Sequence, residues 1–342
     1  MASNTIKDVA RVAGVSIATV SRCINSPAQV RPKTREKVMA AVQETGYAPN
    51  KIAQSFRSGR THVIMVVLPS VGDPFFTEVM TGVRAAAQAA GYSILINETQ
   101  FNTMTDKEIG ALIVSKQVDG IILLASMSPF GRKVLSAHSK RAIPFVVGCE
   151  KVSDDLVEFP SIHIDNLAAA EEATNLLIGL GHERIAFMSG DPSSLLTHDR
   201  EAGYRKAMTD AALNVPEQYT VHGYLTIDGA KRAANKLLNE PVRPTAMFCA
   251  NDEMAIGTLH CIRQAGLRVP EDISVVGFDD TRYAEVAMPP LTTISQPAAK
   301  IGKRTVERLV EAIEGVGTRA ASPELLPHKL IIRQSVGPVP SA

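Results

Sequence analysis

Two hydrophobic patterns divide the chain. In the first sixty residues, apolar side chains recur every three or four positions, which is typical of short amphipathic helices. From residue 62 onward, short apolar runs such as "HVIMVVLP" and "GIILLAS" alternate with longer amphipathic stretches. Strands that alternate with helices in this way predict parallel sheets. We therefore expect a small all-α head followed by an α/β body.

The end signals of the head predict three helices. Thr5 and Asp8 have the spacing of a capping box, and Gly14 supplies a tight turn after the first helix. Ser16 can cap a second helix, which must end before Pro27. A third helix follows and closes the head. A helix, a glycine turn and a second helix form a helix-turn-helix arrangement.

The charge of the chain is concentrated in this head. The whole chain carries a net charge of +1, but residues 1–61 contain ten Lys or Arg and only three Asp or Glu. The head therefore has a net charge of +7 and the body of −6. A basic head favours a polyanionic partner such as DNA, although a solvated basic face is the simpler alternative.

The stretch "GVSIATVSR" predicts how the head reads DNA. Val15 and Val20 are expected to face the core, which leaves Ile17, Ala18 and Arg22 on the outer side of the second helix. Small apolar groups contact thymine methyls, Arg binds guanine bidentately, and an acid here would repel phosphate. The alternative is a three-helix domain that binds protein.

The chain lacks the signals of several other classes of protein. Its 342 residues favour two or three domains, and no apolar run is long enough to span a membrane. The start has no secretion signal, and Cys23, Cys149, Cys249 and Cys261 lie too far apart for a CxxC pair. We expect a cytoplasmic protein with no membrane partner, no disulfide and no metal site.

No enzyme motif is present either. The sequence has no GxxxxGK[ST], no GxGxxG after a strand, no HExxH and no GxSxG. We therefore expect no catalytic residue and no cofactor. The body instead contains two successive series of strands and helices of similar size, which imply two parallel-sheet lobes. Open parallel sheets bind ligands beyond the carboxyl ends of their strands, so a ligand site is expected between the lobes.

The stretch "TIKDVARVAGVSIATVSRCINSPAQVRPKTREKVMAAVQETGYAPNKIAQSFRSGR" resembles the head of the LacI/GalR (lactose-repressor) family of bacterial transcription regulators. The resemblance implies a dimer that places two helix-turn-helix heads on a palindromic double-stranded operator, with a hinge helix in the minor groove. The family usually has Leu where Phe56 stands. The residues implied at the DNA are Thr5, Ser16, Ile17, Ala18, Thr19, Ser21, Arg22, Asn25, Asn50, Ala53 and Phe56.

The resemblance continues through the body, which looks like a two-lobed periplasmic binding protein. "DPFF", "CANDEMAIG", "SVVGFDDT" and "PPLTTISQP" carry it, the last as a crossing between the lobes. The stretch "LLPHKLIIRQS" is read as a final strand. The residues implied at a small-molecule effector are Phe75, Phe76, Ser126, Cys149, Glu150, His198, Arg200, Tyr224, Asn251, Asp252 and Asp279.

Within the family, "THDREAGY" and "VPEDISVVGFDD" look most like the cytidine-repressor branch and then the purine-repressor branch. This implies a nucleoside effector; a pentose or hexose is the alternative, and a nucleoside- or sugar-processing enzyme is a distant one. The expected domains are a head over 1–49, a hinge over 50–61 and a body over 62–342. We expect the first lobe over about 62–163 and 292–324, and the second over about 164–291 and 325–342.

Overall fold

The computed structural model separates into two compact units, Met1–Thr61 and His62–Ala342. It describes residues 5–25, 29–47, 60–99, 111, 117–124, 143–151, 159–192, 194–316 and 323–340. The expectations for Asn50, Ala53, Phe56 and Ser126 lie outside these residues, as do those for the helices near 105–116 and before residue 143. For Asn25, only the backbone is described.

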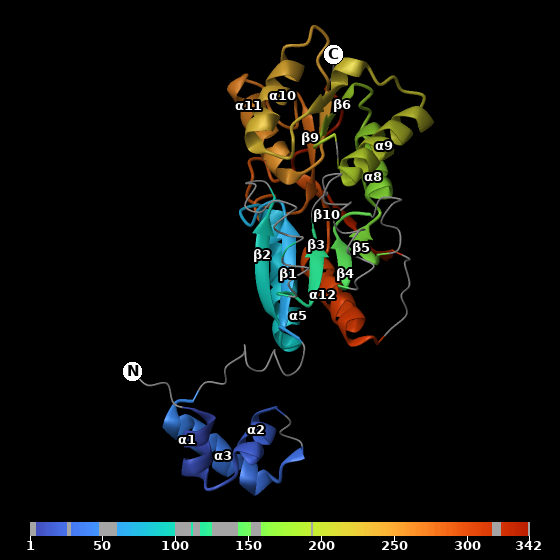
Figure 1. Cartoon of the computed structure of the whole chain (residues 1–342). Helices are drawn as coiled ribbons and strands as arrows, with labels where there is room; N and C mark the ends of the chain where they lie inside the picture. Colours follow the sequence, from blue (N-terminus) through green and yellow to red (C-terminus); the bar gives the residue numbers. More distant parts are fainter. Residues whose placement is uncertain are drawn as a thin grey trace. The chain divides into compact units, whose positions relative to one another are not determined.

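The head consists of the three helices α1 (Ile6–Ala13), α2 (Ile17–Asn25) and α3 (Pro32–Thr45) (Figure 1). Val9, Val20 and Val38 come from different helices and are fully buried together. Val15 packs against the same cluster, so the predicted inward direction of Val15 and Val20 is confirmed. This small core fixes α2 against the other two helices.

The predicted ends of the head helices are present. The Asp8 carboxylate accepts hydrogen bonds from the backbone nitrogen of Thr5 at 2.9 Å and from its hydroxyl at 2.8 Å. Gly14 adopts a φ of 63°, a left-handed conformation that glycine reaches without strain. Ser16 Oγ accepts from the backbone nitrogen of Thr19 at 3.1 Å and so caps α2. Local sequence therefore specifies where α1 ends and α2 begins.

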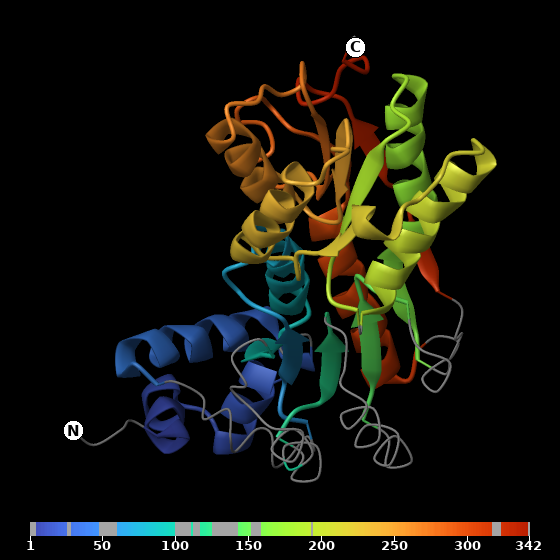
Figure 2. The same ribbon diagram turned by 90° about the horizontal axis from the view of Figure 1, so that it is seen from above.

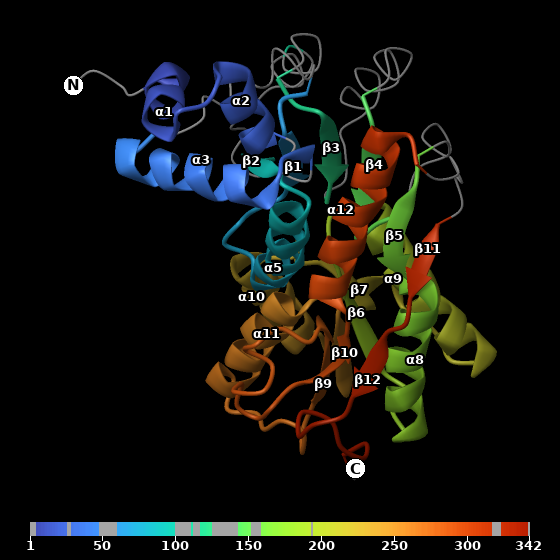
Figure 3. The same cartoon turned by 90° about the horizontal axis from the view of Figure 1, so that it is seen from below.

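The first lobe is built on a parallel sheet with the strand order β11-β5-β4-β3-β1-β2. Helices α5 (Pro74–Ala89) and α12 (Ala298–Glu314) lie side by side on one face of this sheet (Figure 3). Gly82 and Gly302 let their backbones touch, because a Cβ on either would collide with the other helix. The strands are β1 (Val63–Leu68), β2 (Ser93–Glu98), β3 (Gly120–Leu123), β4 (Phe145–Gly148), β5 (Ser161–Ile164) and β11 (Glu324–Leu326).

The second lobe repeats this plan with the strand order β12-β10-β9-β8-β6-β7, in which only β12 is antiparallel to its neighbour. One pair of helices, α8 (Asn166–Gly179) and α9 (Leu195–Asp210), covers one face (Figure 2). The pair α10 (Ile227–Leu238) and α11 (Asp252–Gln264) covers the other. The strands are β6 (Ile185–Ser189), β7 (Thr220–His222), β8 (Ala246–Cys249), β9 (Ser274–Asp279), β10 (Thr292–Ser295) and β12 (Lys329–Ile331).

Near the end of the chain, the strands are divided between the two lobes differently from the expectation. Strand β10 belongs to the second lobe, not to the first, because it pairs with β9 on one side and β12 on the other. The expected single final strand is two strands, with β11 in the first sheet and β12 in the second. Pro327 separates them, because proline has no N–H for a sheet hydrogen bond. In the described part of the chain, no helix is both long and apolar enough to cross a membrane.

Candidate functional site

The outer side of α2 is the candidate DNA-reading face. Ile17 is 45% exposed, a large value for an isoleucine, and Ala18 and Arg22 are exposed beside it. The Thr19 hydroxyl lies 2.9 Å from Ser16 Oγ, so both side chains belong to the helix cap. This face therefore presents small apolar groups and one guanidinium, with no acid in the helix.

The candidate effector site lies where the carboxyl ends of the strands of both sheets meet. We call it the interlobe site and define it by Cys149 and Glu150 of the first lobe and Arg200 and Asp279 of the second. Cys149 and Glu150 follow β4, Asp279 ends β9, and Arg200 comes from the second turn of α9. All four side chains are almost completely buried. The prediction that these segments converge agrees with this geometry.

Arg200 is the central cation of the interlobe site. Its Nε donates to Asn166 Oδ1 at 2.9 Å, and its guanidinium carbon lies 3.6 Å from the centre of the Phe278 ring. Its Nη2 lies 3.8 Å from Asp279 Oδ1, too far for a direct hydrogen bond. Burial lowers the pKa of Arg200, while the carboxylates of Asp279 and Glu150 act in the opposite direction. The protein fixes the guanidinium plane but leaves its contact with Asp279 loose.

Asp279 is the main acceptor of the site. Its Oδ1 accepts from Gln296 Nε2 at 2.7 Å. Burial raises the pKa of Asp279 well above its usual value, although the nearby Arg200 lowers it. Burial also raises the pKa of the Cys149 thiol, and the charges of Glu150 and Asp279 add to that shift. Among the four residues that define the site, two carboxyl groups therefore face one cation.

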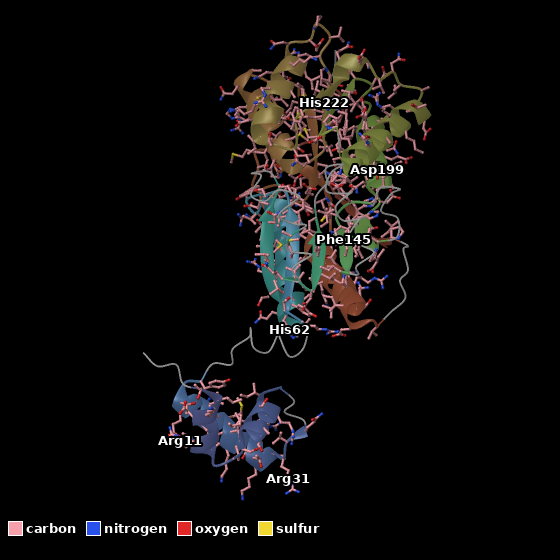
Figure 4. The ribbon with its side chains drawn as sticks, in the orientation of Figure 1. Arg11, Arg31, His62, Phe145, Asp199 and His222 are labelled. Carbon is pink, nitrogen blue, oxygen red and sulfur yellow. The ribbon has the colours of Figure 1, made fainter. Side chains whose placement is uncertain are left out.

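Contacts between the lobes lie beside this cluster. Ser194 Oγ of the second lobe donates to Glu150 Oε1 of the first at 3.3 Å. Lys151 Nζ forms an ion pair of 2.5 Å with Asp199 on α9, whose place in the molecule Figure 4 marks. Because both pairs join the end of β4 to the start of α9, a change in lobe closure must alter them.

The backbone around the interlobe site is strained. The described residues contain seven non-glycine residues with positive φ, and five of them follow or end strands at this edge. Cys149 has a φ of 71° and Asp279 a φ of 113°, values that L-residues rarely adopt. Such strain concentrates at functional sites, so the backbone marks the same edge as the charges do. The other three strained residues are Tyr224, Leu225 and Asp280.

Several expected effector residues have other surroundings. Tyr224 is 54% exposed. The following residue, Leu225, packs on Gly190 next to Thr197, since a Cβ built on Gly190 would collide with both side chains. His198 is exposed and its Nε2 lies 2.6 Å from the carbonyl oxygen of Pro192. Leu225, rather than Tyr224, therefore lies beside α9, and His198, which belongs to α9, is exposed.

The side chains of Asn251 and Asp252 accept hydrogen bonds from other residues of the protein. Asn251 Oδ1 accepts from the backbone nitrogen of Met254 at 2.9 Å and caps α11. The Asp252 carboxylate accepts from the Thr281 nitrogen at 2.7 Å, the Thr281 hydroxyl at 3.1 Å and the Thr293 hydroxyl at 2.6 Å. Burial raises its pKa to about 7 despite these donors. Asp252 therefore joins α11, β10 and the loop after β9, which is a structural role.

This role predicts a stability effect for Asp252→Ala. The substitution leaves the buried donors of Thr281 and Thr293 without an acceptor, which costs about 2–5 kcal/mol of unfolding free energy. Denaturant unfolding measures the loss, and Asp228→Ala on α10, whose side chain is 82% exposed, serves as the control. Equal stability of the two variants would show that the threonines do not depend on Asp252.

Phe75 and Phe76 lie in the core of the first lobe. Their ring centres are 5.2 Å apart in an edge-to-face contact, and both rings are at least nine-tenths buried. Asp73 begins this helix by accepting from the Phe75 nitrogen at 2.8 Å, and burial raises the pKa of Asp73. Both rings therefore belong to the core of the first lobe, in the same apolar cluster as Cys149.

Three side chains of the second lobe were missed from the sequence. Ser189 Oγ, Thr197 Oγ1 and Gln296 Oε1 are buried and have no hydrogen-bond partner among the residues that the structure describes. Each lies at the carboxyl edge of the second sheet, since Ser189 ends β6, Gln296 follows β10, and Thr197 is in the first turn of α9. A polar residue at the end of a predicted strand, or directly after it, was the signal that would have found Ser189 and Gln296.

Family models match both the head and the body of this chain. Residues 5–50 match the model of "Bacterial regulatory proteins, lacI family", and residues 174–336 match a "Periplasmic binding protein-like domain". The repressor CytR of Escherichia coli K12 is 37% identical over 98% of this chain and 97% of its own. The repressor PurR of Vibrio campbellii is 38% identical over 97% of this chain and 98% of its own.

A solved structure is similar to this chain over nearly its whole length. The lac repressor dimer bound to operator and the anti-inducer ONPF is 31% identical, with a TM-score of 0.84, over 98% of this chain and 100% of that one. A helix-turn-helix head joined to a two-lobed binding body defines a ligand-responsive DNA-binding regulator. The chain belongs to the lacI family of bacterial regulatory proteins.

Family membership confirms the coarser expectations drawn from the sequence. The protein is a ligand-responsive, DNA-binding transcriptional repressor of this family, and it is not an enzyme. As a member of this family it acts in the cytoplasm. The fold, a helical head with a body of two largely parallel sheets, is also as predicted.

Proposed function

We propose that the effector of this repressor is a nucleoside. The observation that carries the proposal is the buried pair of Arg200 and Asp279, flanked by Glu150 and the apolar ring of Phe278. Carboxylates accept bonds from vicinal hydroxyls such as those of ribose, and a fixed guanidinium donates to carbonyl or ring-nitrogen acceptors. A nucleoside carries both kinds of group on one molecule.

The charge of the site favours an uncharged ligand. Asp279 and Glu150 outnumber Arg200, and the Cys149 thiol adds no positive charge. In a buried site of low dielectric, a phosphate placed beside two carboxylates is strongly disfavoured. The proposal therefore covers nucleosides but not nucleotides or sugar phosphates. A pentose or hexose is the second candidate, because its hydroxyls suit Asp279 equally well.

The assignment of residues to DNA contact is part of the same proposal. Ile17, Ala18 and Arg22 read bases in the major groove, while Thr5, Ser16, Thr19 and Ser21 hold the helix start against phosphate. Residues 50–61 act as the hinge, with Asn50, Ala53 and Phe56 at the minor groove. Exposure of Ile17 and Arg22 in the free head supports this division.

Calorimetric titration tests the ligand class. The purified full-length protein is titrated with cytidine, uridine, adenosine, guanosine, ribose and glucose, and then with the 5′-phosphate of any nucleoside that binds. We expect one nucleoside to bind at about one per chain and its phosphate to bind far more weakly. Tighter binding of the phosphate would contradict the charge argument, and binding of free sugar alone would contradict the nucleoside.

A further inference from the structure

We infer that Ser189 and Thr197 form a second polar subsite, which binds the part of the effector that Asp279 and Gln296 do not reach. The inference rests on the proposed function, because it concerns the same interlobe site. Its starting point is the set of buried polar atoms that lack a hydrogen-bond partner within the described part of the chain, since native proteins leave few of these. The effector supplies the missing partners when it binds.

The two hydroxyls lie on the same side of the second sheet. The Phe187 ring stacks on Tyr204 of α9, with ring centres 5.2 Å apart. Side chains two positions apart on a strand face the same way, so Ser189 also points to the side covered by α9. Thr197 is on α9, one turn before Arg200, and is 1% exposed. Ser189, Thr197 and Arg200 therefore border one region.

The Thr197 hydroxyl packs closely against the bare backbone of Gly190. A Cβ built on Gly190 would lie 2.6 Å from Thr197 Oγ1 and 2.9 Å from Leu225 Cδ2. The Thr197 hydroxyl therefore contacts the backbone of Gly190, and the apolar side chain of Leu225 lies next to it. A polar group bordered by an apolar wall is the usual arrangement of a small-molecule subsite.

The position of the strands sets the length of the site. Four neighbouring strands each end in a residue of the site. Gln296 follows β10 and Asp279 ends β9. Ala250, whose carbonyl oxygen accepts a hydrogen bond from Arg200, follows β8, and Ser189 ends β6. These four strands are neighbours in that order, and adjacent strands lie about 4.8 Å apart, so the row spans about 14 Å. A single sugar ring covers about one or two of those spacings. The row fits a two-part ligand, with hydroxyls at Asp279 and a second polar group at Thr197.

The experiment compares wild type with Thr197→Val, which keeps the shape and removes the hydroxyl. Both are titrated calorimetrically with the four nucleosides, ribose, glucose, sucrose and maltose. Thr174→Val is the matched control, because Thr174 is equally buried but its hydroxyl already donates to Ala170 at 2.8 Å. Ser189→Ala is a second test of the same subsite. We expect Thr197→Val to weaken the best two-part ligand by about tenfold or more and Thr174→Val to leave it unchanged.

The outcomes separate this inference from the nucleoside proposal. Wild-type binding of a nucleoside with no loss in Thr197→Val or Ser189→Ala overturns the subsite and leaves the nucleoside standing. Binding of a disaccharide that is weakened in Thr197→Val supports the subsite and overturns the nucleoside. Binding of ribose or glucose as tightly as any two-part ligand overturns both.

Discussion

Asp279→Asn is expected to weaken effector binding by about a hundredfold or more while leaving operator affinity unchanged. Removing one partner of a buried, hydrogen-bonded charge at a binding interface typically costs about 2–5 kcal/mol of binding free energy. Here Arg200, 4% exposed, would lose its nearest carboxylate, and the effector hydroxyls would lose a charged acceptor, because Asn keeps one acceptor oxygen and replaces the other with an NH2 donor. Calorimetry with the effector and fluorescence anisotropy with operator DNA measure the two quantities separately.

The control for this substitution is Asp272→Asn. Asp272 also forms an ion pair, at 2.9 Å with Arg268, but it lies on the surface after α11 and away from the interlobe site. The control should keep wild-type effector affinity. If Asp279→Asn retained affinity within about threefold of wild type, Asp279 would not be the acceptor and the effector would bind elsewhere.

Arg22→Ala is expected to remove most of the preference for operator over unrelated DNA. One bidentate contact to guanine discriminates by about 1–3 kcal/mol, and a dimer loses it in both half-sites, so preference falls about thirtyfold or more. Affinity for unrelated DNA should fall only modestly, because Arg22 is one of ten basic residues in the first 61. Anisotropy at fixed salt with operator and with scrambled duplex measures the ratio.

Arg11→Ala removes the same charge from the same head. Arg11 lies on α1, where its side chain is 76% exposed and 3.4 Å from Asp8. It should lower affinity for both duplexes alike and leave the preference intact. Equal effects of the Arg11 and Arg22 substitutions on the preference would mean that Arg22 contributes charge only and reads no base.

The sequence predicted the parts of the structure that depend on local interactions. Thr5, Gly14 and Ser16 specify the ends of the head helices through neighbours within four residues. Alternating apolar runs predicted two parallel sheets, and strand ends predicted the edge where Arg200 and Asp279 lie. These signals suffice because helix caps and buried strands depend on short stretches of sequence.

The sequence failed where distant segments or single side-chain directions decide the outcome. The assignment of β10 and β11 to lobes depends on pairing with strands far away in sequence. Tyr224 and Leu225 both have positive φ, 55° and 58°, so the normal alternation of side chains along a strand does not continue through them. The role of Asp252 depends on Thr281 and Thr293, which no spacing rule connects to it.

The most direct test of the whole account is the coupling between the two sites. An operator is selected from random duplex DNA with the full-length protein, and its affinity is measured without and with saturating effector. We predict a palindromic site whose affinity changes by about 5- to 150-fold on effector binding, which corresponds to a coupling of about 1–3 kcal/mol. In Asp279→Asn the same effector concentration should change nothing. An operator affinity that the effector leaves unchanged in the wild-type protein would contradict the account.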